Sequence, residues 1–262
     1  MCKLEKREDN TILLGRNTVR EAIRSGREID AIYMTESAEA NAREIFALAK
    51  SAGIPIKRAS KSKLDELSRF AAQGEKAANH QGIVAKAAAV RYSTLEDAEA
   101  LAQQRGEPLF LIALDGVEDP HNLGAIVRSA EIFGAHGVII PKRRSVGMTA
   151  AAAKTASGAE EYIPIIKVTN LPAVIDEVKE KGVFVAAADM DGLSADCANL
   201  TGAMMLVIGA EGEGISRLVK QKADFTIKID MYGHINSLNA SAAASVLMYE
   251  KKRQDKLRKV VK

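Results

Sequence analysis

Short apolar runs alternate with helix-like segments along most of this chain, and this alternation limits the possible folds more than any other feature. The strongest run is LFLIALD at residues 109–115, which is apolar up to its last residue. A strand of this kind is buried on both faces, as in a parallel sheet covered by helices. Four similar runs follow it: GVIIP, FVAAAD, MMLVIGA and FTIKI. With helical patterns at residues 122–135 and 241–254, the sequence predicts an α/β domain with a mostly parallel sheet.

The first part of the chain alternates in the same way on a smaller scale. The expected strands cover residues 11–14, 29–34, 54–57 and 82–90, and the expected helices cover residues 17–26, 38–53 and 61–70. Thr94 and Asp97 then resemble a capping box, and Gly106 ends the helix that follows. We therefore expect an amino-terminal α/β domain at residues 1–88, a connecting segment at 89–106 and a second domain at 107–262.

The cysteines and the length of the apolar runs argue against several classes of protein. Cys2 and Cys197 belong to no Cys-x-x-Cys motif or Cys/His cluster, so neither a disulfide framework nor a zinc site is expected. No run approaches the ~20 apolar residues that span a bilayer. Residues 1–10 are charged and lack the apolar core of a signal peptide. We expect a cytoplasmic protein that needs no metal.

Positive charge gathers in three places, although the formal net charge is only +3. Residues 250–262 hold seven Lys or Arg against two acids, and a second cluster covers residues 142–144. Four arginines with helical spacing would line one face of the first helix: Arg16, Arg20, Arg24 and Arg27. Such clusters suit a polyanion. The alternative is a set of solvated faces, in which Glu21 and Glu28 pair with the arginines.

Three loops that follow strands of the second domain hold most of its unusual residues, and ligands of open α/β sheets gather at such strand ends. The first loop, residues 115–124, leads into the helix that carries Arg128. Asn122 is either a helix cap or a functional side chain. The stem of Arg128 is expected to be partly buried beside Ile126 and Val127, where its guanidinium needs a partner. That partner is either a structural carboxylate or a ligand.

The second loop follows the run MMLVIGA and contains glycines at positions 209, 212 and 214. It matches neither the dinucleotide-binding fingerprint nor a Walker A loop. Glu211 and Glu213 would repel a pyrophosphate but suit a cationic ligand such as the sulfonium of S-adenosylmethionine. The alternative is an ordinary turn whose glycines supply positive φ.

The third loop, residues 232–241, opens the last helix, and most of its residues carry a side-chain hydrogen-bonding group. A helix needs only one N-cap, which Ser237 or Asn239 would supply. Because several polar groups converge here, we favour a functional loop. His234 has no neighbours with triad or metal-site spacing, and we expect it on the surface.

These three loops resemble the motifs of the SpoU (TrmH) family of RNA ribose 2′-O-methyltransferases. The matching stretches are DGVEDPHNLGAIVRSAEIFGA, VIGAEGEGI and SLNASAAASV. The amino-terminal part is also similar to the family's substrate-binding domain, through GRNTVREAI and HQGIVA. The resemblance is strongest to the RlmB branch, which methylates a guanosine in the peptidyl-transferase region of large-subunit rRNA. Ala240 replaces the valine that is common in the third motif.

The resemblance implies a fold, a cofactor and a set of site residues. The catalytic domain would be a parallel sheet whose carboxyl-terminal part forms a trefoil knot, and it would act as a homodimer. S-adenosylmethionine would be held mainly by backbone at four positions: Gly209, Ile229, Leu238 and Ala188. Five residues match the catalytic-motif positions: Asn122, Arg128, Glu211, Ser237 and Asn239. The partner would be RNA, with 23S rRNA favoured over tRNA.

Methyl transfer to a ribose requires that the 2′-hydroxyl lose its proton as it attacks the sulfonium methyl. The resemblance assigns Arg128 to this hydroxyl, as general base. A guanidinium normally stays protonated, so stabilisation of the developing alkoxide is the alternative role. Two rival functions are a nicotinamide-dependent oxidoreductase, which lacks its fingerprint here, and a non-catalytic RNA-binding protein. The intact set of motif residues argues against the second rival.

Overall fold

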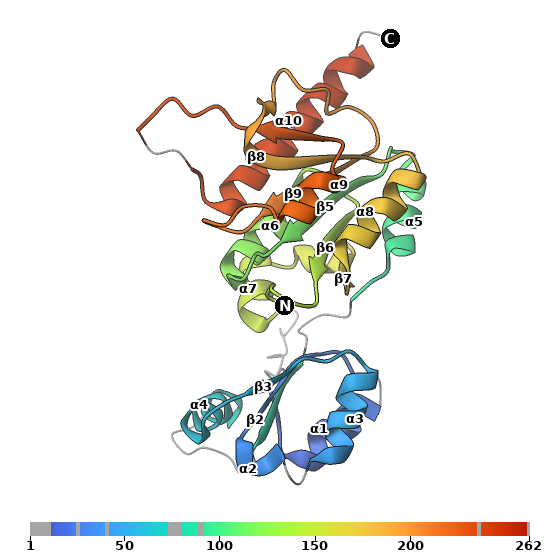
Figure 1. The fold of residues 1–262 in the computed structure, drawn as a ribbon. Coiled ribbons are helices and arrows are strands. Elements are labelled where there is room, and N and C mark those ends of the chain that lie inside the picture. Colours follow the sequence, from blue (N-terminus) through green and yellow to red (C-terminus); the bar gives the residue numbers. More distant parts are fainter. Residues whose placement is uncertain are drawn as a thin grey trace, which may run out of the picture. The chain divides into compact units, whose positions relative to one another are not determined.

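The chain forms two compact units, Met1–Arg91 and Tyr92–Lys262, in the computed structural model shown in Figure 1. The structure describes residues 12–24, 27–39, 42–72, 80–87, 92–234 and 237–260. Cys2 and the expected strand residues 88–90 lie outside the described residues. Helix α5 (Leu95–Arg105), which covers most of the expected connecting segment, belongs to the second unit.

A six-stranded sheet forms the centre of the second unit. Its strands are β5 (Phe110–Asp115), β6 (Gly137–Pro141), β7 (Ile165–Val168), β8 (Phe184–Ser194), β9 (Met204–Gly209) and β10 (Phe225–Lys228). They lie in the order β10-β8-β9-β5-β6-β7, and every pair is parallel. The predicted parallel sheet is confirmed. The sequence reading missed β7, whose four residues are too few to form a distinct apolar run.

Helices cover both faces of this sheet. Besides α5 they are α6 (Pro120–Ile132), α7 (Ala150–Ala156), α8 (Leu171–Glu180), α9 (Arg217–Lys222) and α10 (Ala240–Val260), with a 3-10 turn at Ala159–Glu161. Helices α5, α8 and α9 share one buried apolar cluster with the strands. Helices α6 and α10 contact each other and pack against β6 and β9. Because helices cover both faces, the strands read as continuous apolar runs.

Local sequence signals set the helix ends. Thr94 and Asp97 form the predicted capping box at the start of α5, and Gly106 ends that helix in the left-handed conformation, with φ 63°. Asp119 is the N-cap of α6 and accepts a hydrogen bond from the backbone N–H of His121, with Pro120 in the first turn. Asn122 therefore does not cap this helix.

The first unit is a smaller α/β layer structure. Its elements are β1 (Ile12–Leu14), α1 (Arg16–Arg24), β2 (Ile29–Met34), α2 (Glu36–Glu39), α3 (Arg43–Ser51), β3 (Ile56–Arg58), α4 (Lys61–Ala72) and β4 (Ile83–Ala87). The mixed sheet has the order β1-β4-β2-β3. Helices α1, α2 and α3 share one apolar core with it, whereas Leu64 and Leu67 of α4 pack on its opposite face.

One expectation for this unit is wrong, and another concerns a residue outside the described part of the chain. The single helix expected at residues 38–53 is two helices, because Ala42 adopts φ −121° and ψ 22°, outside the helical region. Residues 40–41 lie outside the described part of the chain. Helix α1 is described to Arg24, and Gly26, its expected end, is not described.

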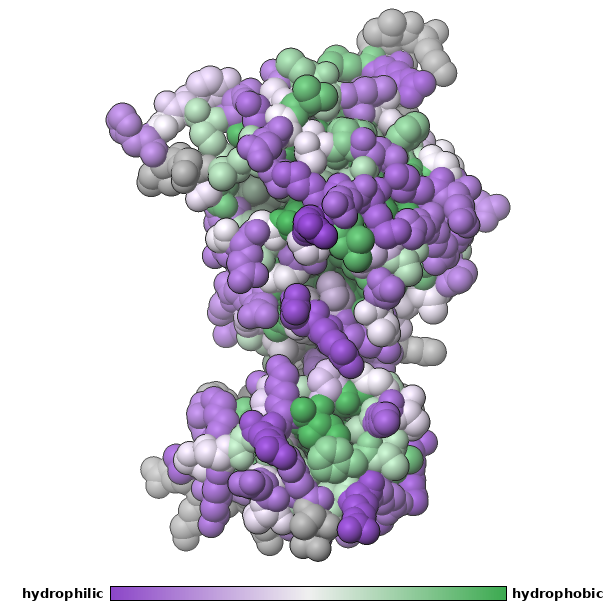
Figure 2. Space-filling view, viewed as in Figure 1, coloured by the Kyte–Doolittle hydropathy of each residue, from purple (hydrophilic) through white to green (hydrophobic). Residues whose placement is uncertain are grey.

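Hydrophilic residues cover most of the visible face of both units (Figure 2). The apolar side chains are instead concentrated inside each unit, for example Phe110 and Leu114 of β5 and Leu123 of α6. Among the described residues, no helix is both long enough and apolar enough to cross a bilayer. The basic helix α10 buries Leu247 and Met248 on the face toward the sheet, whereas Val246, Tyr249 and Leu257 are exposed.

His136 is fully buried at the start of β6. Its Nδ1 accepts a hydrogen bond from the backbone N–H of Phe110 at 3.0 Å, which places the proton of the neutral ring on Nε2. Nε2 lies 3.5 Å from a carboxylate oxygen of Glu107 without forming a hydrogen bond. Burial, followed by the charges of Arg105 and Lys252, lowers the pKa of His136 to about 4.

We expect this buried ring to make folding stability depend on pH. The folded state keeps His136 neutral down to about pH 4, whereas the unfolded chain protonates it near pH 6.5. The neutral ring therefore makes its full contribution to the free energy of unfolding above pH 6.5. This contribution falls by up to about 3 kcal/mol as the pH falls toward 4. His136→Asn, which keeps an acceptor for Phe110, should flatten the unfolding free energy between pH 7 and 4.5. Equal pH dependence in both proteins would contradict this account.

Candidate active site

The three motif loops meet at the carboxyl edge of the parallel sheet. Strands β5 and β9 are neighbours, and Asp115 at the end of one pairs with Gly209 at the end of the other. The first loop leaves β5 and leads into α6, and the second leaves β9. The third follows β10 and leads into α10 (Figure 1). The sequence predicts this meeting of the loops, because parallel strands carry their carboxyl ends at one edge of the sheet.

The second loop is a tight turn that closes on itself. Ala210 and Gly214 exchange two backbone hydrogen bonds, at 3.1 and 3.0 Å, and Gly212 and Gly214 have positive φ. Gly212 and Gly214 are thus needed for the turn, because glycine adopts positive φ without strain. For these two residues the alternative expectation, a turn whose glycines supply positive φ, holds. The carboxylate of Asp115 anchors the loop to β5, since it accepts a hydrogen bond from the backbone N–H of Ser216 at 2.7 Å. Asp115 was not expected as a site residue from the sequence, although it opens the first motif.

Gly209 is required for a different reason. Its φ is not positive, but a Cβ at this position would overlap the backbone carbonyl of Gly214 and lie 2.6 Å from the backbone N of Ile215. The end of β9 therefore packs directly against the backbone of its own loop. No side chain fits between them.

Side chains from all three loops form one hydrogen-bonded network. The Oε1 atom of Glu211 accepts hydrogen bonds from Nδ2 of Asn122 at 3.0 Å and from Nδ2 of Asn239 at 2.6 Å. Nδ2 of Asn239 also donates to Oδ1 of Asn122 at 2.8 Å. Asn122 is buried, while Glu211 and Asn239 are exposed. The network joins the first turn of α6, the β9 loop and the start of α10.

Asn239 has a second role as the N-cap of α10. Its Oδ1 accepts hydrogen bonds from the backbone N–H of Ser241 at 2.9 Å and of Ala242 at 3.3 Å, which are free donors of the first turn. Asn239 is therefore both a helix N-cap and a member of the polar network. Its carbonyl oxygen caps the helix, and its amide nitrogen binds Glu211 and Asn122.

Two predicted catalytic residues lie outside this network. Arg128 is exposed, and within the described ranges it forms no ion pair or hydrogen bond. Ile126, Val127 and Ala130 occupy the inward face of α6, and Arg128 lies on the outward face. Ser237 is also exposed, just before Asn239. Both side chains are accessible to a ligand.

The predicted cofactor residues lie around the same edge. Gly209 ends β9, Ile229 follows β10, and Leu238 precedes α10 with 42% of its surface exposed. Ala188 is half-buried in β8. The neighbouring Asp189 forms an ion pair with Lys220 at 2.9 Å, and this hydrogen-bonded lysine lowers the pKa of the Asp189 carboxyl. Lys220 is therefore held by a protein carboxylate.

Two family models match the chain, one for each unit. Residues 109–249 match the SpoU rRNA methylase family, and residues 12–93 match the domain described as RNA 2′-O ribose methyltransferase substrate binding. The chain belongs to the SpoU rRNA methylase family. The resemblance of the three motif loops to this family is thereby confirmed. The first match contains all of the network residues and both strand ends that support them.

Relatives of known family align with nearly the whole chain. YacO of Bacillus subtilis (strain 168), assigned to the TrmH family of tRNA/rRNA methyltransferases, is 43% identical over 246 residues, which cover 93% of this chain and 95% of YacO. A protein of Staphylococcus aureus (strain COL) with the same assignment is 45% identical over 252 residues, covering 94% of this chain and 98% of its own. This member of the SpoU family is accordingly an RNA methyltransferase. The alternative function, a nicotinamide-dependent oxidoreductase, is excluded.

Solved structures share the fold at lower identity. The SpoU methyltransferase AviRb of Streptomyces viridochromogenes, in complex with AdoMet, has a TM-score of 0.58 and 22% identity, covering 93% of this chain and 89% of AviRb. The AdoMet-bound rRNA methyltransferase of Sinorhizobium meliloti has a TM-score of 0.56 and 23% identity, with coverage of 94% and 89%. These likenesses establish the SpoU fold for this chain.

Proposed function

We propose that this SpoU chain transfers the methyl group of S-adenosylmethionine to a ribose 2′-hydroxyl of RNA, and that its target is a guanosine of 23S rRNA. The observation that carries the proposal is the hydrogen-bonded network of Asn122, Glu211 and Asn239. It gathers polar groups from three loops at the edge of a parallel sheet where such folds bind ligands. The whole chain would act in the cytoplasm, where ribosomal RNA is found.

The residues at this edge fit the cofactor by their chemistry. Gly209 offers backbone without a side chain, and Ile229 and Leu238 offer partly exposed apolar side chains for an adenine ring. The carboxylate of Glu211 suits the positive charge of a sulfonium, whereas it would oppose a phosphate. Ala188 contributes backbone beside the paired Asp189. When bound, S-adenosylmethionine supplies a methyl group on a cationic sulfur.

The catalytic roles follow from charge and accessibility. The 2′-oxygen of the ribose becomes more negative as it gives up its proton and attacks. Arg128 carries a permanent positive charge and is accessible, so we assign it to stabilisation of this oxygen rather than to proton removal. We assign Ser237, which is exposed, to hydrogen bonding of the substrate. Asn122 and Asn239, fixed by Glu211, hold the loops in position.

A homodimer would account for the exposed face that carries Arg128. Ile132 follows Arg128 by one helical turn and has 63% of its surface exposed. Tyr249 of α10 is 58% exposed and packs its ring edge-on against Phe133, and Val246 one turn earlier is 44% exposed. Apolar side chains on two adjacent helices suit a second copy of the same surface. In such a dimer Arg128 would lie at the interface and complete a site shared by both chains.

Charge on this face is expected to separate the dimer into monomers. The double substitution Ile132→Glu and Tyr249→Glu places two carboxylates in the proposed interface, where they would be desolvated and repel each other. Light scattering should show a dimer for the wild-type chain and a monomer for this variant. Tyr162→Glu, which changes an exposed tyrosine outside α6 and α10, is the control and should remain dimeric. A wild-type monomer, or a dimeric double variant, would refute the interface.

The trefoil knot implied by the family resemblance is part of the same proposal. Strand β10 lies at one edge of the sheet, yet the segment that follows it returns to Glu211 and Asn122 beside the central strands. For the knot, this returning segment would also pass through a loop formed by an earlier part of the chain. The described backbone supports this path on both sides of residues 235–236, which lie outside the described part.

The choice between ribosomal and transfer RNA is tested in cells. The relatives' family assignment covers both kinds of RNA, so tRNA is the second candidate substrate. Mapping of 2′-O-methyl groups in a deletion strain should show one 23S rRNA guanosine that loses its methyl group and regains it on complementation. An unchanged 23S rRNA pattern, with a lost methyl group in a tRNA, would replace the ribosomal target with the transfer RNA target.

A further inference from the structure

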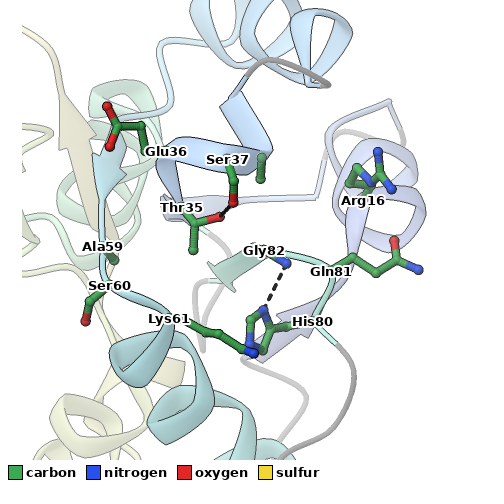
Figure 3. A pocket seen from close by; sticks show the side chains of 11 residues that line it. Arg16, Thr35, Glu36, Ser37, Ala59, Ser60, Lys61, His80, Gln81 and Gly82 are labelled. Atoms are coloured by element: carbon green, nitrogen blue, oxygen red, sulfur yellow. Dashed lines mark hydrogen bonds between the residues drawn. The ribbon is translucent and has the colours of Figure 1, made fainter.

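The amino-terminal unit contains a polar cavity that the methyl-transfer site does not use. Its volume is about 600 Å³. Figure 3 shows side chains from several separate segments directed around it. The lining residues come from four segments, Arg16, Thr35–Ala38, Ala59–Lys61 and His80–Gly82. A cavity of this size is within the range of sites for small ligands, of a few hundred to a thousand cubic ångströms.

The fold brings these segments together at one edge of the small sheet. Strands β1, β2 and β3 end there and lead into α1, α2 and α4, while β4 begins there. Gly82 has φ 77°, and a Cβ at this position would lie 2.8 Å from Thr35 Oγ1 and from the Cβ of Ala38. Thr35 also donates its backbone N–H to the carbonyl of Gly82. The absence of a side chain at Gly82 lets the turn before β4 form one wall.

The histidine in the wall has a fixed orientation. His80 is 7% exposed, and its Nδ1 accepts the backbone N–H of Gly82 at 3.0 Å (Figure 3). Its Nε2 lies 2.9 Å from a carboxylate oxygen of Asp65 on α4. Both ring nitrogens are thus occupied, and His80 holds the turn to α4 rather than presenting a reactive group. The ligand must be recognised by the other lining side chains.

Those side chains are cations and hydrogen-bonding groups. Within the described residues neither Arg16 nor Lys61 has an ion-pair partner. Thr35 and Ser37 share one hydroxyl–hydroxyl hydrogen bond at 3.2 Å, and Gln81 adds an exposed amide. The Glu36 side chain points away from Thr35 and Ser37 (Figure 3). The cavity thus offers two cations and neutral hydrogen-bonding groups, together with the exposed carboxylate of Glu36.

The other arginines expected to form a stripe on α1 are engaged elsewhere. Arg20 and Arg24 both pair with Glu44 of α3, at 3.7 and 2.6 Å, and both also pair with Glu21. Arg27 lies beyond the described end of α1. The alternative expectation, in which Glu21 pairs with the arginines, is confirmed for Arg20 and Arg24. Of the expected stripe's members within α1, Arg16 alone lines the cavity.

We propose that this cavity binds one unpaired nucleotide of the RNA substrate. Arg16 and Lys61 bind the two phosphates that flank it in the RNA strand, and the hydroxyls of Thr35 and Ser37 hydrogen-bond its ribose and base. The inference rests on the proposed RNA methyltransferase function and gives it a recognition site. All lining residues lie within the segment that matches the substrate-binding family model, residues 12–93. An unpaired nucleotide exposes the base edges that such groups read.

A pair of charge-matched variants of the full-length protein tests the site. Arg16→Ala with Lys61→Ala removes both cavity cations, and Arg24→Ala with Lys63→Ala removes the same charges from the same two helices outside the cavity. Arg24 and Lys63 are paired with Glu44 and Glu66. In filter binding with a 23S rRNA fragment, the first variant should bind at least tenfold more weakly. The slope of log K against the logarithm of the salt concentration should become shallower by between about 1 and 2, because two phosphate contacts are lost.

A cavity-filling variant separates shape from charge. Ser37→Phe leaves the net charge unchanged and places a ring where the base would lie, so it should also weaken RNA binding about tenfold. S-adenosylmethionine affinity and the circular dichroism spectrum should stay at wild-type values in all variants. RNA affinity in the cavity variants equal to that of the control variant overturns the nucleotide site. Because binding is measured without catalysis, an inactive wild-type protein would count against the methyl-transfer proposal alone.

Discussion

Replacing Arg128 with alanine is expected to lower methyl transfer to RNA at least 100-fold while leaving S-adenosylmethionine affinity unchanged. The reason is the exposed position of this guanidinium on α6, where it has no ion-pair partner among the described residues and lies outside the network that holds the motif loops. Loss of a cation that stabilises a developing alkoxide costs about 3 kcal/mol in the transition state, which corresponds to this factor. Turnover and calorimetric cofactor affinity should be measured on the same preparation.

Two results would decide against this role for Arg128. An alanine variant that keeps more than about a tenth of the wild-type rate has lost under ~1.4 kcal/mol, too little for a catalytic group. Equal losses of cofactor affinity and rate would make Arg128 a cofactor-binding residue instead. Arg128→Lys keeps the charge but loses the planar fork, and we expect an intermediate rate from it.

Replacing Gly209 with valine is expected to weaken S-adenosylmethionine binding about 100-fold, or roughly 2.7 kcal/mol. Any Cβ at this position meets the backbone of Gly214 and Ile215, so the tight loop must move away from the end of β9. Movement of the loop also shifts Glu211, which fixes the two asparagines of the network. Calorimetry measures the affinity, and circular dichroism shows that the variant is folded.

The matched control for this change is Gly233→Ala. Gly233 lies in the third loop, and an added Cβ there meets no atom within 4 Å, so we expect affinity within a factor of about two of wild type. Wild-type affinity in a folded Gly209→Val protein would mean that the cofactor binds away from the end of β9. If both variants lost the same cofactor affinity, the contact of position 209 with the backbone of the β9 loop could not be the cause.

The parallel sheet of the second unit was predictable because helices cover both of its faces. Residues 110–114 of the run are all buried, and Leu109 and Asp115 at its ends are partly buried, which leaves a continuous apolar signal in the sequence. Strand β7 leaves no such signal, because only Ile165 and Ile166 of its four residues are buried. The break between α2 and α3 depends on the backbone conformation at Ala42, a helix-forming residue type that gives no warning in the sequence.

The meeting of the three loops was also predictable, but their hydrogen bonds were not. Strand ends of a parallel sheet share an edge, so the motif residues had to lie near one another. That Glu211 would bind both Asn122 and Asn239 depends on where the β9 loop closes, which sequence spacing does not give. The exposure of Arg128 follows from helical periodicity once Ile126, Val127 and Ala130 are known to face inward.

The ionic contacts of the first unit depended on tertiary structure in the same way. Glu21 was a foreseeable partner of the α1 arginines because it lies on the same helix. Glu44 was not, since it reaches Arg24 only after α3 packs beside α1. These pairs turn an apparent stripe of positive charge into a neutralised surface. They leave Arg16 as the α1 arginine at the cavity.

Identification of the methylated nucleoside decides whether this protein methylates the ribose 2′-oxygen of RNA. The purified protein is incubated with S-adenosylmethionine labelled in its methyl group and with unmodified 23S rRNA, and the RNA is digested to nucleosides for mass spectrometry. We predict label in the ribose of guanosine, at a linkage that resists alkaline hydrolysis because its 2′-oxygen is blocked. Label on a base, or none with any RNA, would contradict the account.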